Sequence, residues 1–167
     1  GNVLKAAIGD AALNALSAKL REVEGTGGFS ITDTDAVDGT ALTPEDRVVL
    51  VGALVPYIRM LKEKGCSFSI LERTSDPLKG DELDHYVPPE GAREAVSSAS
   101  LVIATGATLV NGSIDRLLGW APDDSRVIIV GPTASMLPHA LFERGVDVLG
   151  GVRITDPRAV MRIIIEG

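Results

Sequence analysis

The stretch RVVLVGALVPYIRMLKEKGCSFSILE, residues 47–72, decides the fold of this 167-residue chain. It opens with a β-branched run over Arg47–Gly52, which predicts a short buried strand that ends in glycine. Apolar residues at helical spacing then predict a helix over Ala53–Lys64, with Pro56 in its first turn. A second buried strand is predicted over Ser67–Glu72. A strand, a helix and a strand in this order predict two parallel strands joined by a right-handed crossover.

The same alternation continues to the end of the chain. Further strands are predicted over Ser100–Thr105, Arg126–Val130 and Val146–Leu149. Helices are predicted between and after them, over Pro88–Ala99, around Val110–Leu118, over Ser135–Arg144 and after Asp156. Nearly all-apolar strands are typical of a sheet that is covered on both faces. We therefore expect an α/β fold of three layers, Rossmann-like and doubly wound, with a mainly parallel sheet of about five strands in the order 2-1-3-4-5.

The segment before this pattern has a different character. Residues 3–24 predict an amphipathic helix, with Leu13, Leu16, Leu20 and Val23 on one face. Residues 25–44 form a long polar connection, which we expect to be functional, partly strand-like or mobile. The chain starts without a Met and enters the helix almost at once, so we expect further residues upstream. We divide the chain into an N-terminal helix and connecting segment over residues 1–44 and a Rossmann-like domain over residues 45–167.

Net charge and cysteine content limit which binding partners and which cellular compartment we expect. The formal net charge of −7, from 23 acidic and 16 basic residues, argues against a general binder of phosphate backbones, so we expect no nucleic-acid partner. The lone Cys66 permits no disulfide within the chain, which fits a reducing compartment. The apolar runs are too short to span a bilayer. We expect a cytoplasmic protein with no membrane partner.

The topology predicts where a ligand lies. In open parallel sheets, ligands bind beyond the carboxyl ends of the strands, near the switch in strand order. Glycine follows four of the five strands, which suits close approach of a ligand but also ordinary turns. We expect a small-molecule ligand at these strand ends. The expected ligand-binding residues are Gly52, Glu72, Thr105, Gly106, Thr108, Asn111, Gly112, Ser113, Gly131, Pro132 and Thr133.

The most specific of these strand ends is Thr105–Asp115, TGATLVNGSID. It places small, hydrogen-bonding residues where the first N–H groups of a helix are free. Asn111 is as well explained by helix capping as by ligand contact. Glu72 and Asp115 are the candidates for a catalytic acid or base. His85, in a long loop, is a further candidate for substrate contact.

Cofactor chemistry is less well defined by the sequence. The loop after the first strand lacks G-x-G-x-x-G, which disfavours NAD and FAD and leaves S-adenosylmethionine or a mononucleotide less strictly excluded. The only histidines, His85 and His139, have no further His, Cys or paired acid at ligand spacing, so we expect no intrinsic zinc site and name no metal ligand. The sequence alone identifies no cofactor, and it leaves open whether the chain forms a homodimer.

Residues Thr105–Asp115 resemble the TGTTLVNGT signature of the putative heavy-metal-chelation domain family, a family of unknown function. The resemblance extends over about residues 5–167. Its other parts are Ile8–Leu16, Val49–Gly52 with Pro56, Ile70–Arg73, Val130–Thr133 and Gly145–Asp156. It implies a Rossmann-like domain preceded by a smaller α+β domain that resembles the N-terminal domain of enolases, with the active site in the cleft between the two. Residues 1–44 are then the remnant of that upstream domain or the link to it.

The resemblance also implies a range of roles. These are heavy-metal chelation, or the condensation or hydrolysis of a small pterin-, flavin- or siderophore-like molecule. An enzyme of this kind is one hypothesis, with Glu72 or Asp115 as acid or base. A non-catalytic binding protein for a metal complex, with the heavy metal held through an organic ligand, is a second. A nucleotide- or S-adenosylmethionine-binding domain is a third, resting on fold analogy alone.

Overall fold

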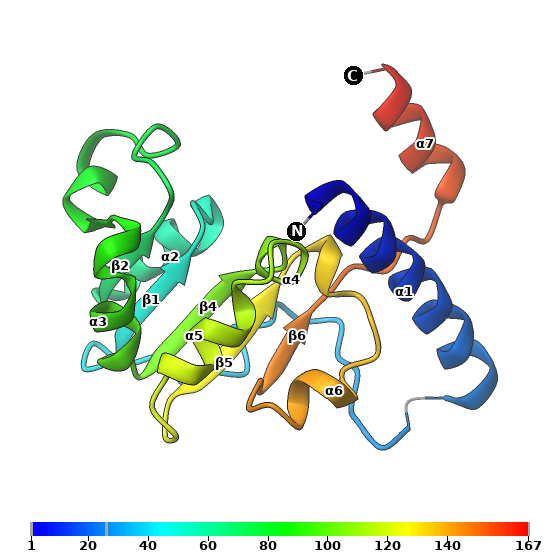
Figure 1. Cartoon of the computed structure of the whole chain (residues 1–167), viewed down its shortest axis with the longest axis horizontal. Helices are drawn as coiled ribbons and strands as arrows, with labels where there is room; N and C mark the ends of the chain where they lie inside the picture. Colours follow the sequence, from blue (N-terminus) through cyan, green and yellow to red (C-terminus); the bar gives the residue numbers. More distant parts are fainter. Residues whose placement is uncertain (1, 26, 167) are drawn as a thin grey trace.

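A parallel sheet forms the centre of the structure, a computed structural model that describes residues 2–25 and 27–166 (Figure 1). Its six strands are β1 (Arg47–Val51), β2 (Ser67–Leu71), β3 (Tyr86–Val87), β4 (Leu101–Thr105), β5 (Arg126–Val130) and β6 (Val148–Gly150). They lie side by side in the order β3-β2-β1-β4-β5-β6, and every neighbouring pair is parallel. The strand order therefore reverses at β1, with β2 on one side of it and β4 on the other.

The predicted fold class is confirmed, with one strand added. The five predicted strands correspond to β1, β2, β4, β5 and β6 and lie in the predicted relative order. The sixth, β3, lies in a stretch that we expected to be loop. It pairs Tyr86 with Ile70 and Val87 with Leu71 at the edge of the sheet. A two-residue strand is too short to produce a periodic apolar pattern, so the sequence carried no signal for it.

Helices cover both faces of the sheet. They are α1 (Val3–Glu24), α2 (Val55–Lys64), α3 (Ala92–Ser97), α4 (Ala107–Val110), α5 (Ile114–Trp120), α6 (His139–Phe142) and α7 (Pro157–Glu166). Ile58 and Leu61 of α2 pack in the core on one face, whereas Val96 of α3 and Leu117 of α5 pack on the other. These are the three layers that the sequence predicts.

Two predicted helices are shorter than expected, for local reasons. The helix predicted over Pro88–Ala99 begins as a 3-10 turn, η2 (Pro89–Gly91), and becomes α3 only at Ala92. Consecutive prolines cannot donate backbone hydrogen bonds, which delays the start of a regular helix. The helix predicted over Ser135–Arg144 is confined to α6, which starts directly after Pro138. A further 3-10 turn, η3 (Pro132–Ala134), follows β5.

A row of apolar side chains across four strands fixes the register of the sheet. Leu50 is paired with Ile70 on one side and with Ile103 on the other, and Ile103 is paired with Ile128. All four side chains are fully buried. Burying each one contributes about 1.5–3 kcal/mol, and a slip of one residue would turn the whole row to the opposite face. The register aligns the carboxyl ends of β1, β4 and β5 at one edge.

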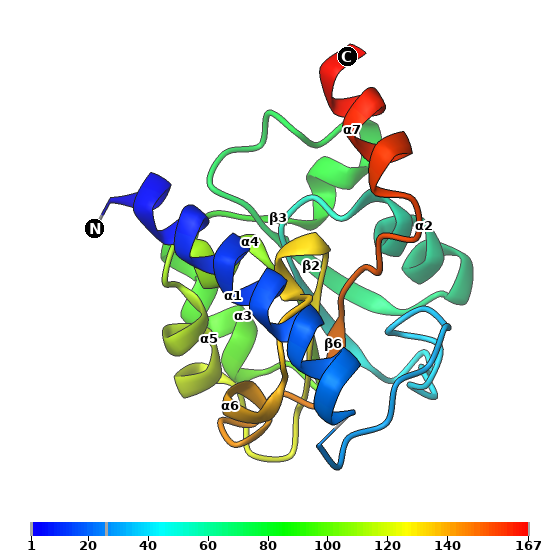
Figure 2. The same ribbon diagram turned by 90° about the vertical axis from the view of Figure 1, so that its right-hand side faces the viewer.

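The N-terminal helix α1 crosses this carboxyl edge (Figure 2), where it contacts α4 and η3. Its polar side faces the sheet: Ser17 is buried, and Arg21 donates a hydrogen bond to the carbonyl of Ser135 at 2.9 Å. Its apolar residues, Leu13, Leu16, Leu20 and Val23 among them, are exposed. The predicted helix is therefore present, but its apolar face belongs to neither of the two hydrophobic clusters among the described residues.

The connection between α1 and β1 forms turns and contains no strand among its described residues, 25 and 27–44. Val37 is only 2% exposed and packs in the α2-side core, and Ala36 and Leu42 pack against the same cluster. The connection is therefore anchored to the sheet unit. At the other end of the chain, α7 extends away from the sheet (Figures 1 and 2) and buries none of its side chains. None of the described helices is long and apolar enough to cross a membrane.

Candidate functional site

The carboxyl ends of β1 and β4 meet at the point where the strand order reverses. Gly52 follows β1 with a φ of 105°, in the region that favours glycine, and its N–H donates to the carbonyl of Leu71 at 2.9 Å. A Cβ at Gly52 would lie only 3.1 Å from Cγ2 of Thr105, the last residue of β4. The structure thus brings Gly52 and Thr105, two of the predicted site residues, into contact.

The ends of β4 and β5 are packed as tightly. The Gly106 N–H donates to the carbonyl of Val130 at 2.7 Å, and a Cβ at Gly106 would lie 2.8 Å from Cβ of Thr133. Gly131 has a φ of 117° and accepts the N–H of Ala134, which closes the turn η3. Predicted site residues therefore form a continuous edge from Gly52 to Thr133. At Gly106 the need for glycine comes from packing between the two loops.

Two helices begin at this edge without a side-chain cap. The N-cap residue of α2 is Leu54 and that of α4 is Gly106, and neither supplies a side-chain acceptor. The first N–H groups of a helix have no partner within the helix and carry partial positive charge. Thr105 places its hydroxyl oxygen 3.4 Å from the Ala107 N–H. In α2 the Val55 N–H donates to the carbonyl of Ala53 at 3.0 Å and Pro56 has no N–H, so the edge between β1 and β4 presents few free backbone donors beside the Thr105 hydroxyl.

The remaining residues of the Thr105–Asp115 segment engage one another or distant partners. The buried Thr108 donates its hydroxyl to the carbonyl of Thr105 at 2.7 Å. Asn111 accepts the Ser113 N–H at its Oδ1 at 2.9 Å, so it stabilises the turn before α5. Gly112 in this turn has a φ of 71°. The side chain of Asn111 is exposed, and its Nδ2 donor makes no hydrogen bond to the described residues.

The two candidates for an acid or base lie in different surroundings. Asp115 forms an exposed ion pair with Arg144, 2.6 Å away, which the sequence could not reveal because the partners are 29 residues apart. Glu72 follows β2, one strand from the edge between β1 and β4, and is half-buried. Its nearest hydrogen-bond partner is the N–H of Arg73, at 3.4 Å. Glu72 is therefore the candidate without an ion-pair partner among the described residues.

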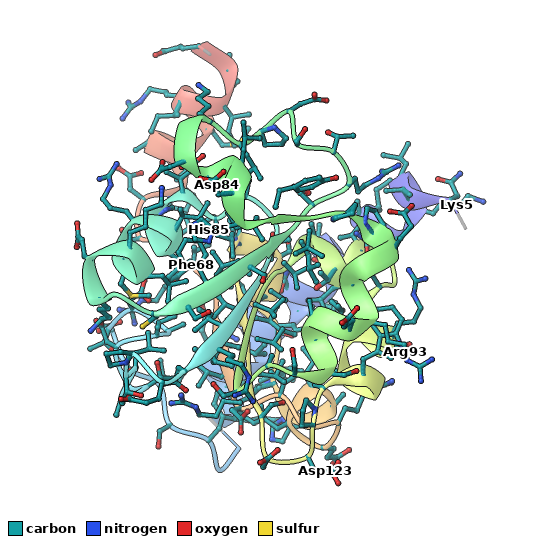
Figure 3. All side chains as sticks on the ribbon, turned by 90° about the vertical axis from the view of Figure 1, so that its left-hand side faces the viewer. Lys5, Phe68, Asp84, His85, Arg93 and Asp123 are labelled. Atoms are coloured by element: carbon teal, nitrogen blue, oxygen red, sulfur yellow. The ribbon has the colours of Figure 1, made fainter. Side chains whose placement is uncertain are left out.

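The side chain of His85 is held by contacts with Phe68. Its ring stacks on Phe68, with the ring centroids 3.8 Å apart, and its Nδ1 lies 3.1 Å from the carbonyl of Phe68 (Figure 3). Phe68 is the second residue of β2, so these contacts lie toward the amino end of that strand. They place His85 away from the carboxyl edge at which we expected it to meet a substrate. His139, the other histidine, contacts the carbonyl of Gly27 at 3.1 Å.

Sequence reasoning missed two side chains of α1 that reach the edge. Asn14 donates through Nδ2 to Oδ2 of Asp10 and to the carbonyl of Thr133, both at 3.0 Å. These two bonds fix the amide and leave its buried Oδ1 without a partner among the described residues. Burial raises the pKa of Asp10, against the opposing effect of the Asn14 hydrogen bond. The only sequence signal was a polar residue within the apolar run AALNAL.

Tyr57 connects α2 to the N-terminal connection. Its hydroxyl donates to Oδ2 of Asp35 at 3.1 Å. Burial, followed by the negative charge and the hydrogen bond of Asp35, raises the pKa of Tyr57 to about 12.

Among residues 2–25 and 27–166, no group of three or more His, Cys, Asp or Glu side chains is placed to hold a metal ion.

Relatives of the chain are themselves uncharacterised. An uncharacterized protein of Methanocaldococcus jannaschii is 26% identical over 162 residues, covering 93% of this chain and 57% of that protein. Two crystal structures of DUF364-family proteins of unknown function share the fold. The Pyrococcus horikoshii protein has a TM-score of 0.75 and 22% identity, covering 94% of this chain and 60% of its own. The Desulfitobacterium hafniense protein has a TM-score of 0.74 and 24% identity, covering 99% of this chain and 62% of its own.

This chain therefore spans about three fifths of the length of these relatives. The likeness to the two crystal structures supports the fold. The family is shown by a separate comparison, in which the model of the DUF364 family matches residues 35–167 and so includes every strand of the sheet and the Thr105–Asp115 segment. The chain belongs to the DUF364 family, whose description is "Putative heavy-metal chelation".

Proposed function

We propose that this domain binds a small polar organic ligand at the edge formed by the carboxyl ends of β1 and β4. One observation carries the proposal. Two helices, α2 and α4, begin without side-chain caps on either side of the contact between Gly52 and Thr105. Such a place at the switch in strand order is where open parallel sheets bind ligands. The partial positive charge at the start of α2 and the hydroxyl of Thr105 favour a ligand with carboxylate, phosphate or hydroxyl oxygens.

The same donor set supports a chelator-like ligand. Hydroxyl and backbone N–H groups recognise the oxygen atoms of an organic molecule, whereas soft heavy metals prefer thiolate ligands. Together with the family's description, this favours a metal that arrives already held by the organic ligand. The ligand would be of a pterin-, flavin- or siderophore-like kind. If the domain also catalyses its condensation or hydrolysis, Glu72 is the acid–base residue left without an ion-pair partner among the described residues.

The exposed apolar face of α1 supports a second part of the proposal. Helix α1 turns polar side chains to the carboxyl edge and leaves Leu13, Leu16 and Leu20 exposed. A contiguous apolar face of this kind marks a surface that another folded unit covers. We propose that residues 1–44 link the Rossmann-like domain to such a unit and that the unit completes the ligand site over the edge. Asp10, Asn14 and Thr133, which already contact one another, would then lie together on one wall of the completed site.

The first experiment is native purification, followed by mass spectrometry of released small molecules and elemental analysis. We expect a small organic molecule at stoichiometric amount, with any heavy metal released together with it. Thr105→Val removes the edge hydroxyl and should reduce the retained ligand about 10-fold, because one lost hydrogen bond costs roughly 1–1.5 kcal/mol. Ser125→Ala removes a hydroxyl that bonds the Pro122 carbonyl before β5, at the opposite edge, and serves as the control. Equal retention by both variants would contradict the proposal.

A further inference from the structure

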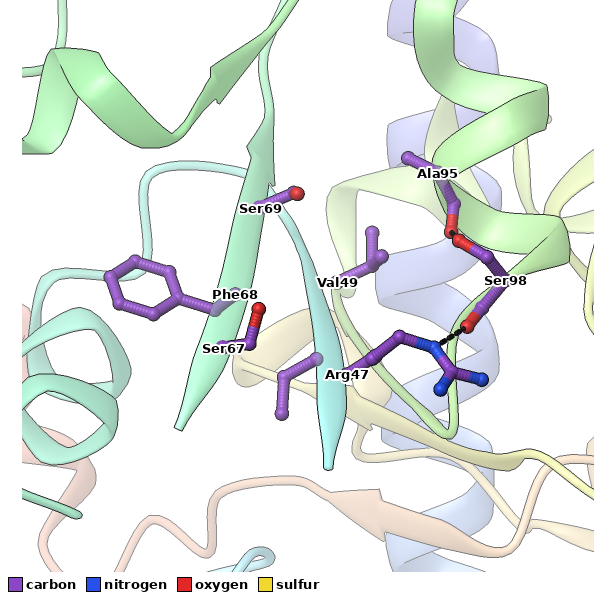
Figure 4. A pocket seen from close by; sticks show the side chains of 8 residues that line it. Arg47, Val49, Ser67, Phe68, Ser69, Ala95 and Ser98 are labelled. Carbon is purple, nitrogen blue, oxygen red and sulfur yellow. Dashed lines mark hydrogen bonds between the residues drawn. The ribbon is translucent and has the colours of Figure 1, made fainter. Parts of the chain in front are cut away.

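Two surface features of the molecule lie outside the candidate site. One is a hollow of about 100 Å³ at the amino ends of β1 and β2. There the Arg47 guanidinium donates to the carbonyl of Ser98 and is directed away from Ser67 and Ser69, so the polar groups do not converge (Figure 4). The other feature is the helix α7, which extends away from the sheet and buries none of its side chains (Figures 1 and 2). The sequence of α7 specifies the kind of partner that it fits.

Helix α7 has one apolar face. Val160, Met161, Ile164 and Ile165 occupy positions i, i+1, i+4 and i+5, which lie on one side of an α-helix. The side chains of Met161, Ile164 and Ile165 are 54%, 69% and 75% exposed. A helix of ten residues is shorter than the roughly 12–15 residues that an isolated helix needs in water, so its stability comes from packing of such a face. The apolar face of α7 therefore needs a partner.

The apolar surface around α7 is large enough for a small dimer interface. Ile163 in the helix, and Val152 and Ile154 in the segment before it, are exposed as well. Together with the three residues above, they make six aliphatic side chains that present roughly 100 Å² each. Two copies that cover these side chains would bury about 1,200 Å² in total, the lower end of the range for specific interfaces. Such an area predicts a dimer that forms and dissociates with concentration.

The charges beside the apolar face suit an antiparallel pair of helices. Arg158, Arg162 and Glu166 follow one another at intervals of four residues, so they lie on one flank of that face. None of the three forms an ion pair with a described residue. A two-fold axis beside Arg162 places Arg158 of each copy beside Glu166 of the other. A parallel pair would instead set like charges against each other along the whole flank.

We propose that α7 is a dimerisation element, which pairs antiparallel with α7 of a second copy of this chain across a two-fold axis. Met161, Ile164 and Ile165 would form the buried centre of the interface. The two pairs between Arg158 and Glu166 would fix its orientation. The proposal is independent of the proposed function, since it uses no residue of the edge between β1 and β4.

The first test is sedimentation velocity of the full chain over a range of micromolar concentrations. We expect a reversible equilibrium between monomer and dimer. Ile164→Asp should weaken the dimer at least about 100-fold, because each dimer loses two buried isoleucines and gains two buried charges. The matched control is Leu83→Asp, at an exposed leucine between β2 and β3, and it should change the affinity less than about 2-fold.

A charge exchange tests the antiparallel pairing itself. Arg158→Glu alone and Glu166→Arg alone should each weaken the dimer roughly 5- to 10-fold, because both symmetry-related pairs become like-charge pairs. The double variant restores the two opposite-charge pairs and should return the affinity to within about 3-fold of the wild-type value. Because α7 buries none of its side chains, all variants should keep the circular dichroism spectrum of the wild-type protein.

Each outcome decides for or against the pairing. A wild-type protein that stays monomeric at the highest concentration would overturn the proposal, and so would a dimer that Ile164→Asp leaves intact. Monomeric protein that binds lipid vesicles, with binding lost in Ile164→Asp, would assign the apolar face to a membrane surface instead. Weakening by both single charge variants without recovery in the double variant would contradict the antiparallel arrangement.

Discussion

Replacing Gly106 by alanine tests the packing that builds the candidate edge. Gly106 has a φ of −56°, which any residue adopts, so the substitution introduces no backbone strain and its cost is steric. The new methyl group would lie 2.8 Å from Cβ of Thr133 and 3.2 Å from the backbone nitrogen of Ala134. Carbon atoms in contact are normally 3.5–4.0 Å apart or more, so the β4–α4 loop and the η3 turn must separate by about 1 Å. Overpacking of this kind costs about 1–3 kcal/mol.

The assay is urea and thermal unfolding monitored by circular dichroism. For a chain of this length, a loss of about 2 kcal/mol lowers the Tm by roughly 4–8 °C. Gly119→Ala is the matched control, because a Cβ at Gly119 in α5 meets nothing within 4 Å. That substitution should leave stability unchanged or raise it by up to about 1 kcal/mol through helix propensity. A Gly106→Ala variant as stable as the wild-type protein would refute the close packing of Gly106 on Thr133.

Three further predictions concern polar groups. Asp46→Asn should cost about 1–3 kcal/mol near neutral pH. Burial alone would raise the pKa of Asp46, but hydrogen bonds from Thr43 and Ser100 and the charge of Arg126 lower it. The stabilisation by Asp46 is therefore complete above the ordinary pKa of about 4, and it is lost as pH falls through the folded-state pKa. Unfolding titrations of both proteins should therefore converge in acid; a constant difference would contradict this. Tyr57 should ionise with a pKa of about 12 in an ultraviolet titration, and a normal value near 10 would show that Asp35 and burial do not act on it. Asn111→Ala should lose both ligand retention and some stability, whereas Asn111→Asp keeps the turn acceptor and should lose only retention; full retention by Asn111→Asp would leave Asn111 with the turn role alone.

The sheet was predictable because its signal is local. Arg47–Val51 and Arg126–Val130 are short, nearly all-apolar runs, and such runs alternating with helical patterns specify a parallel sheet. The strand order followed from right-handed crossovers with one reversal. Boundaries were less predictable, because Pro88, Pro89 and Pro138 shorten helices whose apolar spacing extends further.

The side-chain contacts of the candidate edge could be predicted only in part. The strand ends identified Gly52, Thr105 and Gly106, since their positions follow from topology. The Asn14 contact with Thr133 joins residues 119 positions apart, and nothing in the local sequence specifies such a pair. The way in which α1 packs on the sheet could not be predicted either, because amphipathic periodicity shows which residues share a face but not what that face contacts.

The central claim is that a ligand binds at the carboxyl edge between β1 and β4. The most direct measurement is a titration of nitrogen-15-labelled protein with the small molecule released from the native preparation, followed by backbone amide resonances. The account predicts the largest shifts at Gly52, Thr105 and Gly106, with the amides of Ser67 and Ser69 at the opposite edge unchanged. Shifts at Ser67 and Ser69 with none at Gly52 and Thr105 would contradict it.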